Sequence, residues 1–169
     1  AYQPETYSYV DQAVARGYVT FNIDRLGAGK SGVPDGLTNN INSNAYVLNQ
    51  VVNALRGGRF GYSFQTVITV GHSFGSAIAV AQASQYHNVD GVILTGYAHN
   101  ADPINALAAQ YLYPANLDPK FGLLAPLNYL TTLPNTRGQL FYNVPTSDAQ
   151  VIALDEQLKD MVSAGLMAD

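Results

Sequence analysis

The G-x-S-x-G motif at residues 71–75 constrains this chain more than any other stretch, because it stands between a strand pattern and a helix pattern. The β-branched run at residues 66–70 precedes the motif and predicts a strand, and the alanine-rich run at residues 76–81 predicts a helix. A sharp turn between the two would expose the hydroxyl of Ser73 at the end of a sheet, where a base can activate it. The sequence therefore predicts Ser73 as a nucleophile.

The neighbours of Ser73 suit such a turn. Gly71 and Gly75 lack Cβ atoms. We expect that a Cβ atom at either position would clash with the neighbouring backbone in so tight a turn. A helix N-terminus favours negative charge, because its free N–H groups and the positive end of its dipole meet there. The backbone N–H of Phe74 is the expected oxyanion donor, since the residue after the nucleophile takes this role. The alternative is a glycine-flanked turn without catalytic function in some other α/β protein.

A second motif, at residues 24–31, supports the catalytic interpretation. It reads D-R-x-G-x-G-x-S, with Asp24, Arg25, Gly27, Gly29 and Ser31 in place. Together the two motifs resemble the α/β-hydrolase family, over residues 4–97, and in style the esterase-like members common in filamentous fungi. The resemblance implies an α/β fold with a parallel sheet, flanking helices and the start of a helical cap. It also implies a serine hydrolase that needs no cofactor.

The same loop has an alternative interpretation as a phosphate cradle. Gly27, Gly29, Lys30 and Ser31 loosely resemble a nucleotide-binding loop. The required G-x-x-x-x-G-K-[ST] spacing is absent, because only one residue separates the two glycines. A structural role is therefore favoured, in which Asp24 and Arg25 hold the loop beside the turn at Ser73.

Strand and helix patterns alternate through the first part of the chain. Helices are expected at residues 4–16, about 45–56 and 74–86, and strands at 18–24, 66–71 and 91–96. Such alternation predicts a parallel sheet with right-handed crossovers. We assign residues 1–97 to the hydrolase core.

The pattern changes after Tyr97, and we assign residues 98–169 to a helical cap or lid. Asp102 and Pro103 predict a helix start, and Ser147 with Gln150 forms a capping box for a final helix that runs to Met161. The Leu- and Tyr-rich stretch at 104–142 fits either core packing or an apolar lid over a substrate pocket.

Composition excludes several other functions. The net charge of −4 and the absence of a Lys/Arg cluster argue against nucleic-acid binding. No apolar run is long enough for a membrane span, and no acidic or histidine cluster has the spacing of a metal site. The chain has no cysteine, which excludes internal disulfides and leaves the compartment open, with secretion as the preferred interpretation.

Three histidines limit the choice of a base for Ser73. His72 adjoins Ser73, so its side chain must leave in another direction, and we expect it to pack beside the nucleophile. His87 follows at the far end of the helix, roughly 18 Å away at the usual helical rise. His99 is the only internal candidate, but the family order Ser, acid, His leaves no room for an acid-bearing strand before it. We predict that base and acid come from outside this chain.

The strand count leads to the same prediction. Three expected strands are few, because sheets usually have about four to six, and they leave apolar edges unpaired. The second oxyanion donor is expected before the first helix, which begins at Pro4. We therefore expect companion polypeptide segments of the same hydrolase to complete the sheet and the triad.

Three functions remain for comparison. The leading one is hydrolysis of a carboxylic ester, with a lactone or an amide as related substrates, through an acyl-enzyme on Ser73. In this hypothesis His72 and Tyr97 bind substrate. A lyase of the hydroxynitrile type would keep the same turn and use its base differently. A non-catalytic binding module that retains the fold is the third, because fold alone does not establish function.

Overall fold

The computed structural model describes residues 2–98, 102–122 and 125–168, and the side chains of 102–105 are not among the described parts. The first part of the chain forms the helices α1 to α4 and the strands β1 and β2. Their bounds are α1 Pro4–Tyr7, α2 Tyr9–Ala15, α3 Ile41–Arg56, β1 Ile68–His72, α4 Phe74–Tyr86 and β2 Gly91–Thr95.

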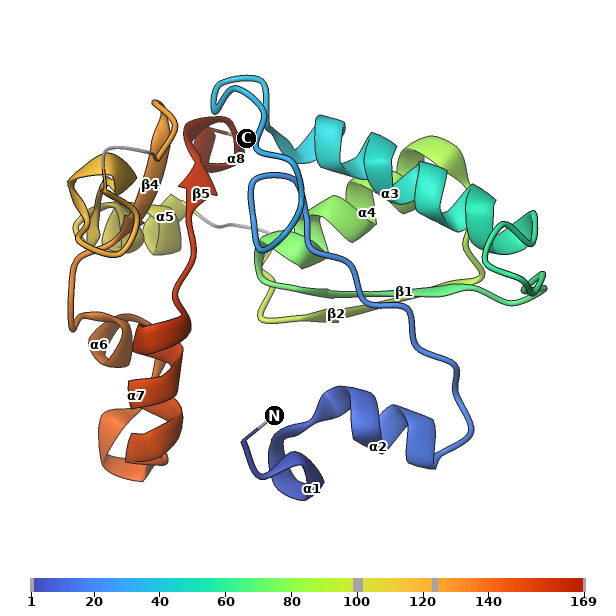
Figure 1. The fold of residues 1–169 in the computed structure, drawn as a ribbon, viewed down its shortest axis with the longest axis horizontal. Helices are drawn as coiled ribbons and strands as arrows, with labels where there is room; N and C mark the ends of the chain where they lie inside the picture. Colours follow the sequence, from blue (N-terminus) through green and yellow to red (C-terminus); the bar gives the residue numbers. More distant parts are fainter. Residues whose placement is uncertain (1, 99–101, 123–124, 169) are drawn as a thin grey trace.

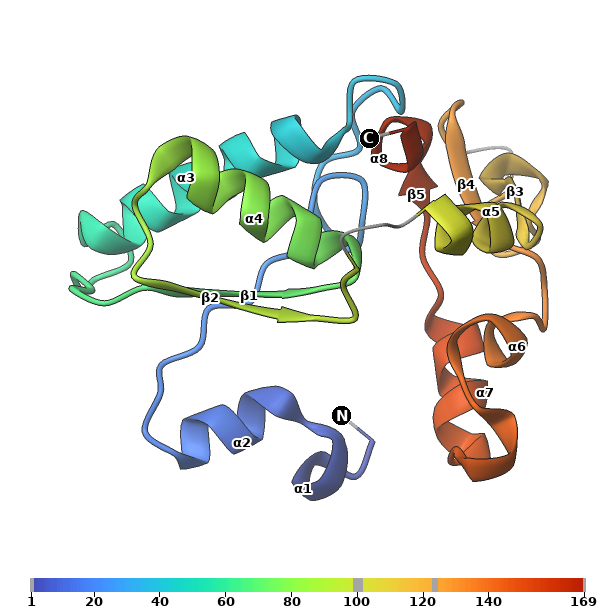
Figure 2. The same ribbon diagram turned by 180° about the vertical axis from the view of Figure 1, so that it is seen from behind.

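Strands β1 and β2 pair in parallel, with Ile68 opposite Gly91 and His72 opposite Thr95. Helices α3 and α4 lie together on one side of this pair, and α1 and α2 lie on the other side (Figures 1 and 2). Thr69 is buried on the covered face, whereas Ile68 and Val70 are 45% and 48% exposed on the opposite one. The predicted alternation of helix with parallel strand is therefore confirmed for β1, α4 and β2.

The predicted strand at residues 18–24 is wrong. Among the described residues, no backbone hydrogen bond joins this segment to β1 or β2, and Phe21 and Ile23 are exposed. A strand exists only through the ladder it shares with a neighbour, and among the described residues this segment shares no ladder with another strand. Its β-branched and aromatic composition alone does not make it a strand.

Two helix predictions also need correction. The expected helix at 4–16 is divided at Ser8, whose side chain accepts a hydrogen bond from the backbone N–H of Asp11 and so starts a new helix. The final helix, α7 (Ala149–Leu158), is capped by Asp148 rather than by Ser147, whose hydroxyl donates to the carbonyl of Asn143 instead. It ends at Leu158, three residues before the predicted Met161.

The second part of the chain contains strands as well as the predicted helices. Strands β3, β4 and β5 form a small antiparallel sheet in that order. The bounds here are α5 Asp102–Ala109, β3 Leu112–Pro114, β4 Tyr129–Thr132, α6 Arg137–Phe141, β5 Val162–Ser163 and α8 Ala164–Ala168, with short 3-10 turns at Ala115–Leu117 and Val144–Thr146.

Buried polar contacts connect the two parts. The Ser163 hydroxyl donates to the backbone carbonyl of Asn39, and the Asn39 amide donates to the Tyr129 hydroxyl at 3.0 Å. The backbone N–H of Gly165 donates to the carbonyl of Gly36 at 2.8 Å. Helix α8 therefore lies against the loop that precedes α3, although the two are far apart in sequence (Figure 1).

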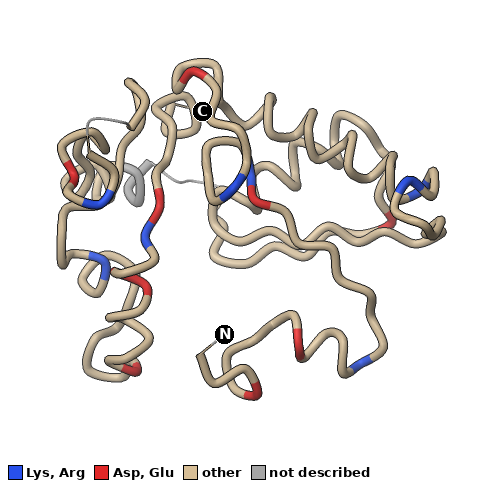
Figure 3. Tube along the Cα trace, viewed as in Figure 1, with Lys and Arg blue, Asp and Glu red and all other residues tan. Residues whose placement is uncertain are grey.

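Charged residues are few, and positions of both signs are scattered along the described chain (Figure 3). None of the helices within the described ranges combines the length and apolar character that crossing a membrane requires.

Candidate active site

Ser73 occupies the turn between β1 and α4. Its φ is 52° and its ψ is −122°, a backbone conformation that costs a non-glycine residue about 1–3 kcal/mol. The side chain is exposed, and no described residue hydrogen-bonds to its hydroxyl. A strained, exposed serine between a strand and a helix is the arrangement that the motif predicts.

The two glycines of the motif differ in their surroundings. A Cβ atom on Gly71 would lie 2.3 Å from the carbonyl oxygen of Gly75 and 2.6 Å from Cα of Ser76, so glycine is required there. A Cβ atom on Gly75 would meet no described atom within 4 Å. The expectation that both glycines prevent a clash is therefore correct for Gly71 and wrong for Gly75, which has open space around it.

Some backbone N–H groups around Ser73 already donate a hydrogen bond, and others have no acceptor among the described residues. The N–H of Ser73 donates to the carbonyl of Thr95 at 2.9 Å, and the N–H of Ser76 donates to the carbonyl of Ser73 at 2.8 Å. Within the described structure, the N–H groups of Phe74 and Gly75 have no acceptor. The amide of Phe74 is thus open to an oxyanion, whereas that of Ser73 already belongs to the sheet.

His72 lies at the end of β1, on the face of the sheet that α3 and α4 leave uncovered. Its Nδ1 lies 3.0 Å from the hydroxyl oxygen of Thr95. The ring therefore lies beside the end of β2. That His72 packs beside the nucleophile and that it binds substrate both stay predictions.

The remaining candidate site residues differ in where they lie relative to Ser73. His87 ends α4, at the opposite end of the helix from Ser73. Tyr97 is exposed two residues beyond β2, at the same end of the sheet as Ser73 because Thr95 pairs with His72. His99, the internal candidate for the base, lies outside the described residues. Among the described residues, no histidine hydrogen-bonds to the hydroxyl of Ser73.

The D-R-x-G-x-G-x-S loop is held by its own acidic residue and by a distant one. The Asp24 carboxylate accepts from the N–H of Lys30 at 2.9 Å, and the Asp160 carboxylate accepts from the N–H of Gly29 at 2.7 Å. The Arg25 guanidinium donates to the carbonyl of Met161 at 3.0 Å. Carboxylates thus occupy the amides that a phosphate would need, which supports the structural interpretation of this loop.

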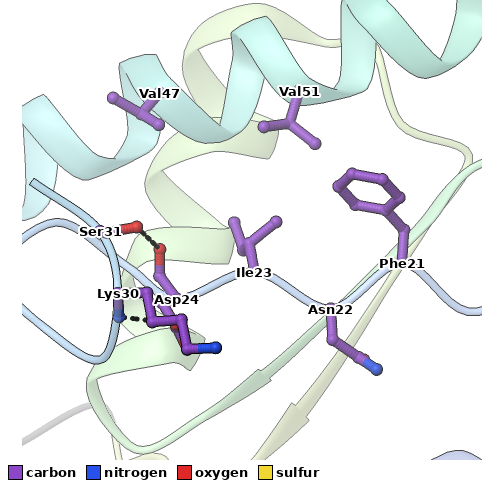
Figure 4. Close-up of a pocket in the computed structure, with 8 residues that line it drawn as sticks. All are labelled: Phe21, Asn22, Ile23, Asp24, Lys30, Ser31, Val47 and Val51. Carbon is purple, nitrogen blue, oxygen red and sulfur yellow. Dashed lines mark hydrogen bonds between the residues drawn. The ribbon is translucent and has the colours of Figure 1, made fainter. Parts of the chain in front are cut away.

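A pocket of about 310 Å³ opens between this loop and α3 (Figure 4). Phe21, Ile23, Val47 and Val51 give it an apolar wall, and Asp24 bonds to both Lys30 and Ser31 at its edge. A second pocket lies between α6 and α7. Neither is lined by Ser73, so neither is the place where the proposed chemistry would occur.

Two residues at the turn were missed by sequence reasoning. Ser76 was expected only as part of the helix after the motif, and Thr95 only as part of the strand at 91–96. Both hydrogen-bond across the turn. No local signal marks them, because serine and threonine are ordinary in such positions and the contact joins two separate elements.

Among the described residues no three metal-ligating side chains cluster.

Comparison with known proteins agrees with the geometry. A family model described as serine aminopeptidase, S33, matches residues 6–165, well beyond the 4–97 region that carries the sequence motifs. No curated protein sequence matches the chain.

Among solved structures, a methylesterase from Arabidopsis superposes with a TM-score of 0.63 at 16% identity. The match covers 96% of this chain and 62% of the methylesterase chain, so this chain corresponds to less than two thirds of that protein. At that identity the likeness shows the fold alone, which is the predicted α/β-hydrolase fold. The chain belongs to the serine aminopeptidase, S33, family of α/β-hydrolases.

Proposed function

We propose that this chain carries the nucleophile of a serine hydrolase that cleaves a carboxylic ester through an acyl-enzyme on Ser73. The observation that carries the proposal is the conformation of Ser73. Its hydroxyl is exposed on a positive-φ turn, and the amide of Phe74 stands open beside it. Backbone strain at an exposed nucleophile is typical of a site held ready for reaction.

The reaction follows from these groups. Ser73 Oγ attacks the acyl carbon while a base takes its proton, and the carbonyl π electrons move to the oxygen. The N–H of Phe74 donates to that oxyanion. When the tetrahedral intermediate collapses, the C–O bond to the alcohol breaks and the alcohol leaves with the proton from the base. Water then attacks the acyl-enzyme in the same way, releasing the acid and restoring Ser73.

The base and the acid of the triad are proposed to come from polypeptide outside residues 1–169. His72 bonds to Thr95, and His87 is at the other end of α4, so neither described histidine is placed to accept the proton of Ser73. His99 is the internal alternative. A companion segment of the same hydrolase would also supply the second oxyanion donor.

The family description names an aminopeptidase and the structural neighbour is titled a methylesterase, so both acyl classes are tested. The active protein is incubated with a fluorophosphonate probe, and the labelled peptide is sequenced by mass spectrometry. We expect the label on Ser73, together with turnover of p-nitrophenyl esters and methyl esters. Faster turnover of amino-acid anilides would make an amide, rather than an ester, the proposed substrate class. A protein that turns over neither class, or that carries the label elsewhere, would overturn it.

A further inference from the structure

Thr95 ends β2 and contacts the chain on both sides of Ser73. Its carbonyl accepts from the backbone N–H of Ser73 at 2.9 Å and from the hydroxyl of Ser76 at 2.9 Å. The Ser76 oxygen in turn accepts from the N–H of Thr95 at 3.2 Å. Ser76 is fully buried in the first turn of α4, so this reciprocal pair connects the start of the helix to the end of the strand.

The side chain of Thr95 adds a second connection, to the strand side of the turn. Its hydroxyl donates to the carbonyl of Gly71 at 3.1 Å and lies 3.0 Å from His72 Nδ1. A hydroxyl has one proton, so while it bonds to Gly71 it must accept from an Nδ1–H of His72. Thr95 therefore contacts the residues immediately before Ser73 as well as the helix after it.

Helix α4 has no side-chain cap that would hold its start. Ser73 is the N-cap residue, and its hydroxyl accepts no hydrogen bond from the first turn. Most helix starts are fixed by such a cap. Here a capping bond would occupy the nucleophile, and the Ser76–Thr95 pair holds the first turn from β2 instead.

We propose that Ser76 and Thr95 are positioning residues, which form a clamp that fixes the backbone of Ser73 and thereby aligns its hydroxyl for attack. The inference rests on the proposed function of Ser73. Ser76 is shielded from solvent and cannot touch a substrate, so its effect passes through Ser73. Misplacing a reacting group by about 1 Å costs up to about a hundredfold in rate.

The first test is Ser76→Ala in the active protein, with Ser84→Ala as the matched control. Ser84 lies in the same helix and is exposed, and within the described part of the chain its hydroxyl bonds only to the carbonyl of Ala81. The fluorophosphonate probe counts the active sites, so that kcat is expressed per reactive Ser73. We expect Ser76→Ala to lower kcat per site by about 10- to 100-fold with KM unchanged, and Ser84→Ala to match the wild type. An unchanged kcat per site in Ser76→Ala would overturn the proposal.

The second test uses Thr95, which is exposed at the end of a strand. A β-branched replacement suits such a position. Thr95→Val keeps the shape but removes the hydroxyl, and Thr95→Ser keeps the hydroxyl. We expect Thr95→Val to lower kcat per site and to speed hydrogen exchange at the N–H of Ser73, and Thr95→Ser to restore both. Equal behaviour of the two variants contradicts the clamp. Failure of the proposed function is distinguishable, because the wild type would then show no label on Ser73.

Discussion

Lys159 Nζ lies 2.7 Å from Asp118 Oδ2, and the two side chains are only 5% and 2% exposed. The same carboxylate accepts from the Tyr113 hydroxyl at 2.6 Å and from the backbone N–H of Lys120 at 2.7 Å. Lys159 also donates to the carbonyl of Thr132 at 3.0 Å. Each charge is therefore hydrogen-bonded several times, which is the condition under which a buried ion pair is tolerated. The pair joins the end of α7 to β4 and the turn after β3.

Stability at neutral pH should depend on this pair. Burial raises the pKa of the Asp118 carboxyl, but the hydrogen bonds from Lys159, Tyr113 and Lys120 and the charge of Lys159 outweigh it and hold the pKa below its ordinary value. Asp118→Asn removes the nearer of the two carboxylates beside the Lys159 ammonium and leaves only Glu156, at 3.5 Å. Breaking this buried pair should therefore lower the free energy of unfolding by urea at pH 7 by about 3 kcal/mol.

The pH dependence of that loss follows from the direction of the shift. A carboxyl whose pKa is lowered on folding stabilises the protein above its unfolded pKa, about 3.9, and this contribution is lost as the pH falls through the folded pKa. The difference between wild type and Asp118→Asn should therefore be constant from pH 7 to 5 and shrink below pH 4. Asp90→Asn is the control, because its bond to Arg56 is exposed and should matter clearly less. A difference that stays constant below pH 4 would contradict this account.

The hydroxyl of Ser73 should be required for turnover but not for folding. No described residue bonds to it, and alanine can occupy the same turn with the same strain. We expect Ser73→Ala to lower ester turnover by about 10⁴-fold or more, and to change the unfolding free energy by less than about 0.5 kcal/mol. Esterase assays and urea unfolding on one preparation measure both. Normal turnover in this variant would remove Ser73 from the mechanism.

Alanine substitutions at the two glycines of the turn should differ in their effect on stability. A Cβ atom on Gly71 meets backbone atoms that cannot move independently, so Gly71→Ala should lose about 1–3 kcal/mol of stability. Gly75 lies in the first turn of α4 with open space around it, and alanine is the better helix former. Gly75→Ala should therefore unfold at the same urea concentration as the wild type or at a higher one. Equal losses at both positions would show that the turn is packed differently.

Local sequence signals predicted the turn at Ser73, but they did not predict the contacts between elements that are distant in sequence. The G-x-S-x-G motif, its strand and its helix are contiguous, so the chain itself carries their order. Residues 18–24 have strand composition, yet pairing depends on a neighbour that composition does not specify. The contacts of Thr95 with Ser73 and Ser76 unite separate elements. No period or motif in the sequence marks them.

The second part of the chain was harder to predict for a related reason. Strands β3 and β5 have three and two residues, too few to show an alternating pattern. Asp148 and Ser147 are both good N-cap residues, and the structure selects Asp148, whose carboxylate accepts from the N–H of Gln150. The helix itself was predicted correctly, but its start was wrong by one residue and its end by three.

The uncovered face of β1 gives the last prediction. Ile68 and Val70 are 45% and 48% exposed there. Apolar surface of this kind is normally covered, and β1 has a hydrogen-bonding partner on one side only in the described chain.

We expect companion polypeptide to cover this face and pair with the free edge of β1, so active material should contain more mass than the 18.1 kDa of residues 1–169. Intact mass spectrometry of the purified active protein measures this directly. Residues 1–169 produced alone should bind a hydrophobic dye strongly and show no esterase activity, because the base and the cover are both absent. A single active species of 18.1 kDa would contradict the prediction. His99 would then be the base, and His99→Ala should abolish turnover while leaving the unfolding curve unchanged.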